Sequence, residues 1–190
     1  MRELILYRLQ RLSALVLIVF VAVHLAGIVV FTRQGLTAAA MSARGENRLW
    51  LYGVFAAIAA LHAAIGLRTL VRERLQVAPR RHARHAAFYA FAAHRATGLA
   101  LVLFLALHFL LLSQLPRAEI IDGVLALTSH PLARAGEIFI VTALALHLAG
   151  GLRILATELL PWRRRRAWRF GAPFVFAGAV AVVYALWGLA

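Results

Sequence analysis

The sequence predicts an all-α integral membrane protein with five transmembrane helices and a cytoplasmic N-terminus. Its 190 residues are 63% hydrophobic and only 15% charged, with a mean hydropathy of +0.82, which is typical of membrane proteins. It contains five apolar runs, and its 21 basic residues, all arginine, flank these runs in blocks. No polar stretch is long enough for a separate soluble core. We therefore expect a single membrane domain over residues 1–190.

Each apolar run is close to the length of about 20 residues that a helix needs to cross a bilayer. The first run contains no charged residue and is too long for the apolar part of a signal peptide, so we expect it to be retained as an anchor. The runs lack the alternation of barrel strands, which favours helices as the way to satisfy the backbone in lipid. The predicted spans are 12–31, 49–67, 96–115, 135–152 and 170–190.

The distribution of arginine predicts the orientation. Sixteen arginines lie in the N-terminal segment and in 68–95 and 153–169, whereas 32–48 and 116–134 hold five. The positive-inside rule places the first set in the cytoplasm and the C-terminus outside. A net charge of +14 could suggest nucleic acid, but these arginines flank membrane spans, so we expect no nucleic-acid partner. The absence of cysteine excludes disulfides and iron–sulfur ligation by this chain.

One histidine lies in each of the first four predicted spans: His24, His62, His108 and His147. His24 lies 13 residues after Arg11, and His108 lies 13 residues after Arg95. The other two histidines each precede an arginine by six residues, so the pattern repeats with an offset of 84 or 85 residues. An ionisable residue within a membrane is costly, and it therefore indicates a function.

The depths of these histidines predict two pairs. Because a helix rises 1.5 Å per residue, His24 and His108 lie about 20 Å from the cytoplasmic end, and His62 and His147 about 9 Å. Haem iron takes two axial ligands on opposite faces, and facing helices of a bundle supply them. We therefore expect the first four spans to form a haem-binding four-helix bundle, with an outer haem on His24 and His108 and an inner haem on His62 and His147.

The internal repeat covers about 5–75 and 89–160, and it leaves 170–190 as an extra helix. Ser13 and Thr97 occupy equivalent positions, each 11 residues before a histidine. Eleven residues make close to three helical turns, so each hydroxyl shares a face with the histidine that follows it.

Other interpretations of the histidines are open at this point. A single histidine in a membrane helix more often bonds to a neighbouring helix than to a metal. Zinc would require three or four ligands at one point, whereas these histidines lie at two levels. A non-haem transporter or proton channel would also use intramembrane histidines, although Glu137 is the one carboxylate inside a predicted span.

Several segments resemble the membrane subunits of succinate dehydrogenase and fumarate reductase. HRATG at 94–98, followed by His108, resembles the HRxTG or HRxSG helix of succinate dehydrogenase cytochrome b subunits. ALHAAIGLR at 60–68 and ALHLAGGLR at 145–153 resemble the haem-ligand helix of the same subunits, and QRLSA at 10–14 resembles the start of the small anchor. The chain is most similar to the single-chain, five-helix, dihaem anchors of this family.

This resemblance implies a haem b anchor in a bacterial inner membrane that transfers electrons between a cytoplasmic dicarboxylate dehydrogenase and membrane quinone. It implies two haem b groups, with His24 and His108 on the distal one and His62 and His147 on the proximal one. The implied partners are an iron–sulfur subunit and an FAD flavoprotein, and the whole complex could be a homo-oligomer. The quinone (ubiquinone or menaquinone) and the direction of the reaction stay open. A dihaem cytochrome b of hydrogenase or formate dehydrogenase type is the alternative.

The resemblance also implies candidate quinone residues. In one-haem relatives the HRxSG region borders a cytoplasmic-side quinone pocket. The matching side chains here, expected at quinone or at haem propionates, are Arg11, Ser13, His94, Arg95 and Thr97. Glu46 matches a carboxylate near an outer quinone site in some dihaem relatives. Ala145 stands where some relatives carry a glutamate for proton transfer, so the chain departs from the family pattern there.

Overall fold

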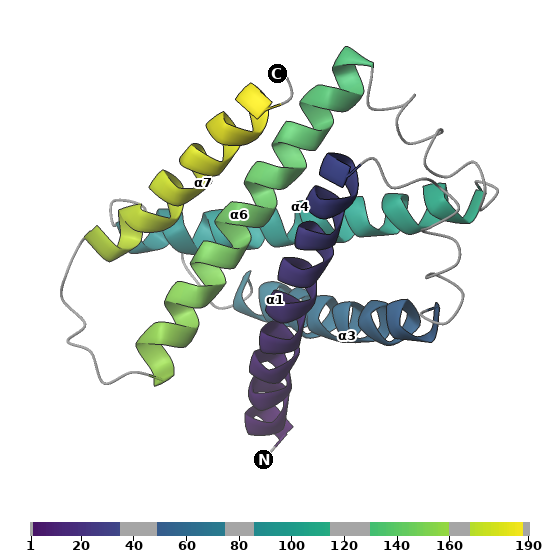
Figure 1. Ribbon diagram of the computed structural model, residues 1–190. Coiled ribbons are helices and arrows are strands. Elements are labelled where there is room, and N and C mark those ends of the chain that lie inside the picture. The colour runs from purple at the N-terminus through teal and green to yellow at the C-terminus, as the bar shows by residue number, and fades with distance from the viewer. Residues whose placement is uncertain (1, 35–48, 75–85, 115–129, 160–167, 188–190) are drawn as a thin grey trace. The chain divides into compact units, whose positions relative to one another are not determined.

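The computed structural model describes residues 2–34, 49–74, 86–114, 130–159 and 168–187, and these residues are almost entirely helical. Figure 1 shows the helices along the chain. They are α1 (Arg2–Gln34), α3 (Leu49–Arg74), α4 (Ala86–Gln114), α6 (Pro131–Leu159) and α7 (Trp168–Trp187). Each contains most of one predicted span, and the all-α class is confirmed.

The first four of these helices extend beyond their predicted spans at the arginine-rich ends. α1 and α4 each begin 10 residues early, and α3 and α6 each continue for seven residues more, whereas the opposite ends agree within four residues. The spans were placed by apolar content, but the helical backbone continues through the arginines. Arginine is a good helix former, and its aliphatic stem lies along apolar surface while its head reaches water.

Among the described residues, four helices are long and apolar enough to cross a membrane. Their apolar segments are Glu3–Gly27, Tyr52–Arg72, Phe88–Leu111 and Pro131–Ala156. Large apolar side chains such as Leu103 and Leu107 are more than 60% exposed, as expected for surfaces that face lipid. The apolar part of α7, Gly171–Leu186, is shorter, so a fifth span stays a prediction.

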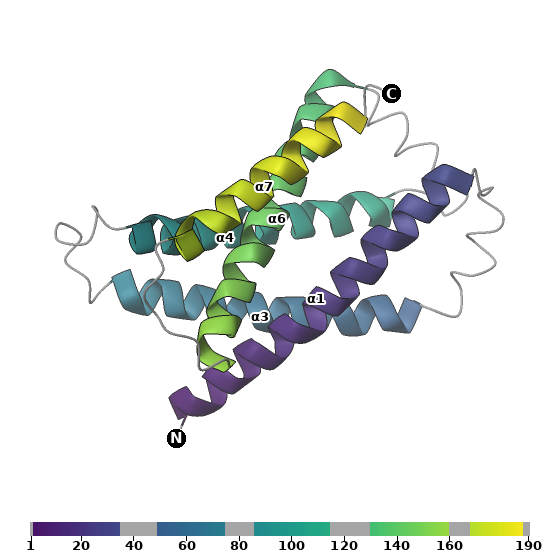
Figure 2. The same cartoon turned by 60° about the vertical axis from the view of Figure 1, so that its left-hand side comes forward.

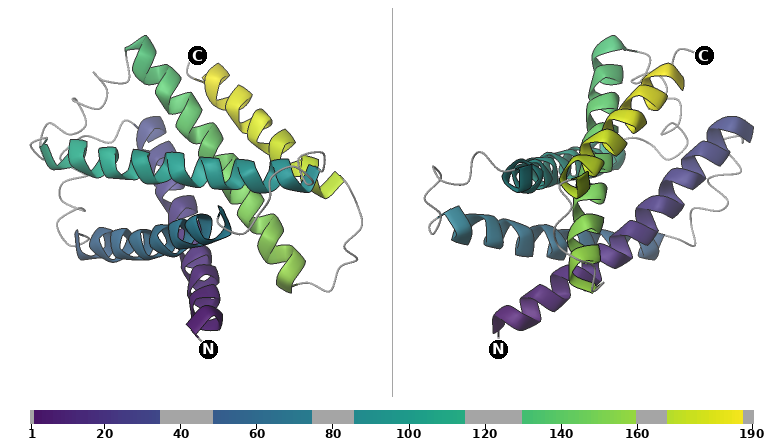
Figure 3. Two further views of the ribbon diagram at one scale, coloured as in Figure 1. Left: turned by 180° about the vertical axis from the view of Figure 1, so that it is seen from behind. Right: turned by 90° about the vertical axis from the view of Figure 1, so that its left-hand side faces the viewer.

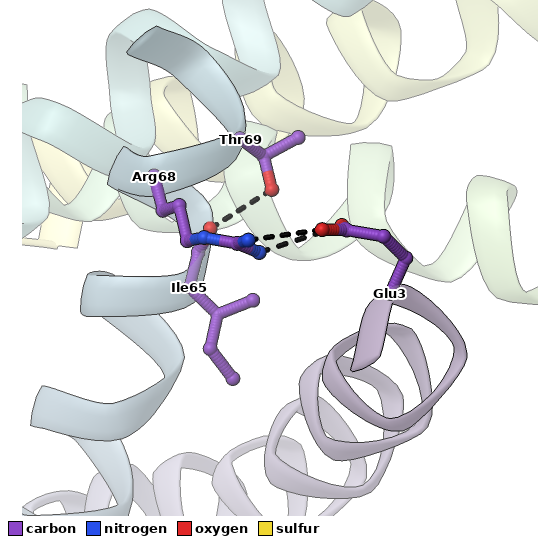
Figure 4. Close-up of polar contacts among 4 residues, drawn as sticks. All are labelled: Glu3, Ile65, Arg68 and Thr69. Atoms are coloured by element: carbon purple, nitrogen blue, oxygen red, sulfur yellow. Dashed lines mark hydrogen bonds and ion pairs between the residues drawn. The ribbon is translucent and has the colours of Figure 1, made fainter. Parts of the chain in front are cut away.

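The chain divides into two compact units, and the first contains α1 and α3. These two helices cross (Figure 2). Ser13 of α1 is buried, and the ring of Phe20 stacks on Phe55 of α3 with centroids 3.9 Å apart. Near the start of α1, Glu3 accepts hydrogen bonds from Arg68 of α3, the shorter at 2.9 Å (Figure 4). Both partners of this ion pair are well exposed, so it adds little stability.

The second unit contains α4, α6 and α7. α7 runs alongside α6, and α4 crosses α6 (Figures 1 and 3). The buried residues of α6 and α7 include Ala143, Ala145 and Ala177, and small residues allow such helices to approach closely. Near the start of α6, Arg134 donates to the Glu137 carboxylate at 2.9 Å, and to a carbonyl oxygen of α7 at 3.3 Å.

The beginning of α6 is capped by a side chain. The N–H of Leu132 donates to Nδ1 of His130 at 3.2 Å, and the N–H of Arg134 donates to the carbonyl oxygen of His130 at 3.0 Å. Pro131 occupies the first helical position, where the missing N–H has no intrahelical acceptor. An exposed histidine in a predicted loop thus fixes where the helix starts.

Replacing Arg134 with alanine should destabilise the contact between α6 and α7. The substitution removes the ion pair to Glu137, which is 27% exposed, and the bond to the carbonyl of Tyr184. Losing a hydrogen bond to a charged group costs about 1–3 kcal/mol, so the thermal unfolding midpoint in detergent should fall. Arg68→Ala is the matched control, because its exposed ion pair contributes about 1 kcal/mol or less. Equal losses in the two variants would contradict this account.

Candidate functional site

The four membrane histidines lie one to a helix, as predicted, and all are half-buried. His24 of α1 and His62 of α3 belong to the first unit, and His108 of α4 and His147 of α6 to the second. The pairing of the ligands stays a prediction, and what the structure describes is how each unit holds its own histidines.

His62 is held by two residues of α1. Its Nδ1 lies 3.0 Å from Oγ of Ser13, and that hydroxyl donates to the carbonyl oxygen of Gln10 at 3.0 Å. Because a serine hydroxyl carries a single proton, donation to Gln10 makes its oxygen the acceptor of Nδ1–H from His62. The other ring nitrogen, Nε2, lies 3.3 Å from the side-chain amide nitrogen of Gln10.

His147 is held by His94 of α4. Nδ1 of His147 lies 3.0 Å from the carbonyl oxygen of His94, and Nδ1 of His94 lies 3.0 Å from the carbonyl oxygen of His147. A carbonyl oxygen only accepts, so both imidazoles carry their proton on Nδ1. The two rings stack with centroids 4.1 Å apart and an interplanar angle of 11°.

Glycines make room for these two rings. A Cβ at Gly98 of α4 would lie 2.9 Å from Cε1 of His147, closer than real contacts allow. A Cβ at Gly150 of α6 would lie 3.0 Å from Nδ1 of His94. Each helix thus presents a histidine that packs against a glycine of the other, and the side-chain-free positions are needed for the close crossing of α4 and α6.

The chemistry of His62 and His147 fits axial ligation of haem iron. A metal-bound histidine donates one ring N–H to a protein acceptor, which fixes the ring and leaves the other nitrogen as the ligand. His147 donates Nδ1–H to a neighbouring helix and carries the lone pair on Nε2, and the contact of His62 Nδ1 with the hydroxyl of Ser13 fits the same tautomer. Haem binding at His62 would require the amide of Gln10 to leave Nε2.

The two other histidines share a different arrangement. The ring of His24 stacks on Phe20 with centroids 5.6 Å apart, and that of His108 stacks on Phe104 at 5.3 Å. Each phenylalanine lies four residues before its histidine, and the two pairs are related by the 84-residue offset. These contacts were not predicted from the sequence, although residues spaced by four share one face of a helix.

Arg11 and Arg95, expected at quinone or haem propionates, each lie over an aromatic ring of their own helix. The guanidinium of Arg11 lies 3.8 Å from the ring centroid of Tyr7 and also donates to its hydroxyl. That of Arg95 lies 3.9 Å from the ring centroid of Phe91. These cation–π contacts hold both side chains along the helix surface.

Ser13 and Thr97 occupy equivalent sequence positions but do not make equivalent contacts. The hydroxyl of Thr97 donates to its own helix, to the carbonyl oxygens of Ala93 at 2.7 Å and His94 at 3.1 Å. Thr97 also lines a mostly apolar pocket of about 240 Å³ between α4 and α6, with Thr142 on the facing helix. Glu46, the candidate for an outer quinone site, lies outside the described residues.

Within the described ranges, no three histidine, aspartate or glutamate side chains gather in a group that could hold a metal ion. The histidines are instead found singly, as His24, His62 and His108 are, or as the stacked pair of His94 and His147.

Comparison with known proteins identifies the family. Residues 72–186, more than half of the chain, match the family model described as succinate dehydrogenase/fumarate reductase transmembrane subunit. The matched residues include α4, α6 and most of α7, and so they include His94, His108 and His147. No curated protein and no solved structure gives a significant match. The chain therefore belongs to the family of succinate dehydrogenase and fumarate reductase transmembrane subunits.

Proposed function

We propose that this protein is the haem b anchor of a succinate dehydrogenase or fumarate reductase complex, which transfers electrons between soluble dehydrogenase subunits and membrane quinone. Family membership supports the role of membrane subunit. The observation that carries the haem proposal is the bond of His147, whose Nδ1 faces the carbonyl oxygen of His94 and whose lone pair is therefore on Nε2; the contact of His62 Nδ1 with Ser13 fits the same tautomer. That is the state in which histidine binds iron.

A bound haem would supply an iron that changes between its ferric and ferrous states one electron at a time. Two imidazoles of the chain would hold and orient this group. Ser13 orients His62, and the backbone of α4 orients His147. Phe20 and Phe104 pack against the other two histidines and limit their rotation.

In this proposal His62 and His147 hold an inner haem, and His24 and His108 hold an outer one. Depth supports these pairs, because the first two lie six residues from Arg68 and Arg153, and the last two 13 residues from other arginines. Ligands of one iron must lie at the same level. Pairing His24 with His62 would leave a mismatch of about 11 Å along the membrane normal.

The arginine-rich ends of the first four helices would face the cytoplasm of a bacterium, with α7 as a fifth span. These ends continue as regular helix beyond the apolar segments. They would form the surface on which an iron–sulfur subunit docks, and that subunit would carry the FAD flavoprotein. Ubiquinone or menaquinone would bind near Arg95 and Thr97, where the pocket between α4 and α6 offers an apolar wall.

Two other functions have less support. A cytochrome b of a hydrogenase or formate dehydrogenase is disfavoured by the family match over residues 72–186. A transporter or proton channel would be expected to use an intramembrane carboxylate, but Glu137 is bound by Arg134 at 2.9 Å.

Methionine substitutions test the ligand pairs. A methionine ligand favours ferrous iron, so each single variant should raise the midpoint potential of one haem and leave the other unchanged. His62→Met and His147→Met should shift the same component in a redox titration of the purified complex. His24→Met and His108→Met should shift the other component. If His62→Met and His24→Met shifted the same component, the proposed pairing would be wrong.

Gly98→Ala should impair the inner haem selectively. Its Cβ would lie 2.9 Å from Cε1 of His147, so the ring must move from its place. Gly136→Ala, on α6, is the matched control, because its Cβ would meet nothing within 4 Å. We expect about tenfold weaker retention of one haem in the first variant and two normal haems in the second, measured by absorbance after size exclusion. Normal haem content and spectra in Gly98→Ala would refute this use of the glycine.

A further inference from the structure

His94 was expected at quinone or haem propionates, but its contacts are with His147. Its ring covers the ring of His147 at a centroid distance of 4.1 Å, nearly parallel to it. Its Nδ1–H reaches across to the main chain of α6. The ring also packs against Gly150, and Cε1 lies 3.4 Å from the position of a Cβ at Gly151. The half-buried side chain therefore contacts α6 around the residue that the proposed function makes an inner ligand.

The two hydrogen bonds between these residues form a closed pair. The carbonyl of His94 fixes the proton of His147 on Nδ1, and the side chain of His94 fixes the carbonyl of His147. Each bond keeps α4 and α6 at the separation that the other bond requires. Removing the side chain of His94 would delete one bond and one wall of the space that confines the His147 ring. The remaining bond would then have to hold both helix spacing and ring orientation.

The parallel stacking also excludes one role for His94. Axial ligands approach an iron end-on from opposite faces of the macrocycle. Two imidazoles stacked face to face at 4.1 Å do not point their nitrogens at a common atom between them. His94 and His147 therefore cannot be the two ligands of one haem in this arrangement.

The first unit offers an independent comparison. Gln10 is related to His94 by the 84-residue offset, and its amide lies 3.3 Å from Nε2 of His62. A Cβ at Gly66 would lie 3.6 Å from that amide, as one at Gly151 would approach the ring of His94. In both units, a hydrogen-bonding side chain at this position lies against the histidine and the glycine four residues after it.

We propose that His94 is a positioning residue for the inner haem, which acts by holding His147 in the tautomer and ring orientation that axial ligation requires. This inference rests on the proposed function, because it assumes that His147 binds iron. It gives His94 no direct contact with the iron. It predicts that the side chain at position 94 controls the geometry of one haem and leaves the other unaffected.

The test compares His94→Leu with His94→Gln in the complex purified from membranes. Leucine fills the space but makes no hydrogen bond, whereas glutamine is the residue at the equivalent position 10 and can donate to the carbonyl of His147. Redox titration, haem content and EPR of the oxidised complex are measured, since the g-anisotropy of a low-spin haem depends on the angle between its imidazole planes. We expect His94→Leu to shift the EPR signal and potential of one haem and to weaken its retention about tenfold. His94→Gln should restore both towards wild type.

A third variant keeps the test decisive if His94→Leu fails to assemble. Gly150→Ala retains His94 but places a Cβ 3.0 Å from its Nδ1, so it should shift the same haem signal. Unchanged EPR and potential in His94→Leu, or in Gly150→Ala where His94→Leu does not assemble, would overturn the inference. Wild-type complex without haem would instead overturn the proposed function, so the two failures are distinguishable.

Discussion

The interaction on which the rest of the structure depends is the hydrogen bond that takes the Nδ1 proton of a membrane histidine to a neighbouring helix. In lipid, a polar group without a partner carries a large free-energy penalty. His62 meets this requirement through Ser13, and His147 through the carbonyl of His94. The same bonds join α3 to α1 and α6 to α4. They also decide which ring nitrogen keeps its lone pair, so helix packing and ligand chemistry have one physical origin.

The two units use equivalent positions in different ways. An aromatic residue precedes an arginine by four residues in both α1 and α4, and a phenylalanine precedes a histidine by four residues in both. These contacts favour the internal repeat that the spacing predicts. The histidine bonds differ, because His62 reaches α1 through a hydroxyl, whereas His147 bonds directly to a backbone carbonyl. The histidine ring can approach the backbone of the neighbouring helix because Gly98 and Gly150 leave space for the rings of His147 and His94.

The helices, the class of protein and the histidine in each of four helices could be predicted from sequence, because apolar runs and arginine blocks are strong local signals. The bounds of the helices could not be predicted. Helix propensity extends the helical backbone beyond the apolar run, to Arg2 at the start of α1 and to Arg74 at the end of α3. The residue that accepts each Nδ1–H could not be predicted either. The acceptor depends on how two crossing helices are rotated about their axes. Nothing in the sequence distinguishes Ser13, whose hydroxyl contacts a histidine, from Thr97, whose hydroxyl donates to its own helix. The role of His94 was missed for the same reason.

The haem content of the purified wild-type protein should be determined first, by pyridine haemochrome absorbance together with a reduced-minus-oxidised spectrum. We predict two b-type haems per chain, both six-coordinate and low-spin. One haem per chain would contradict the two-pair arrangement of the four histidines. No haem, in folded protein from haem-replete cells, would contradict the account as a whole.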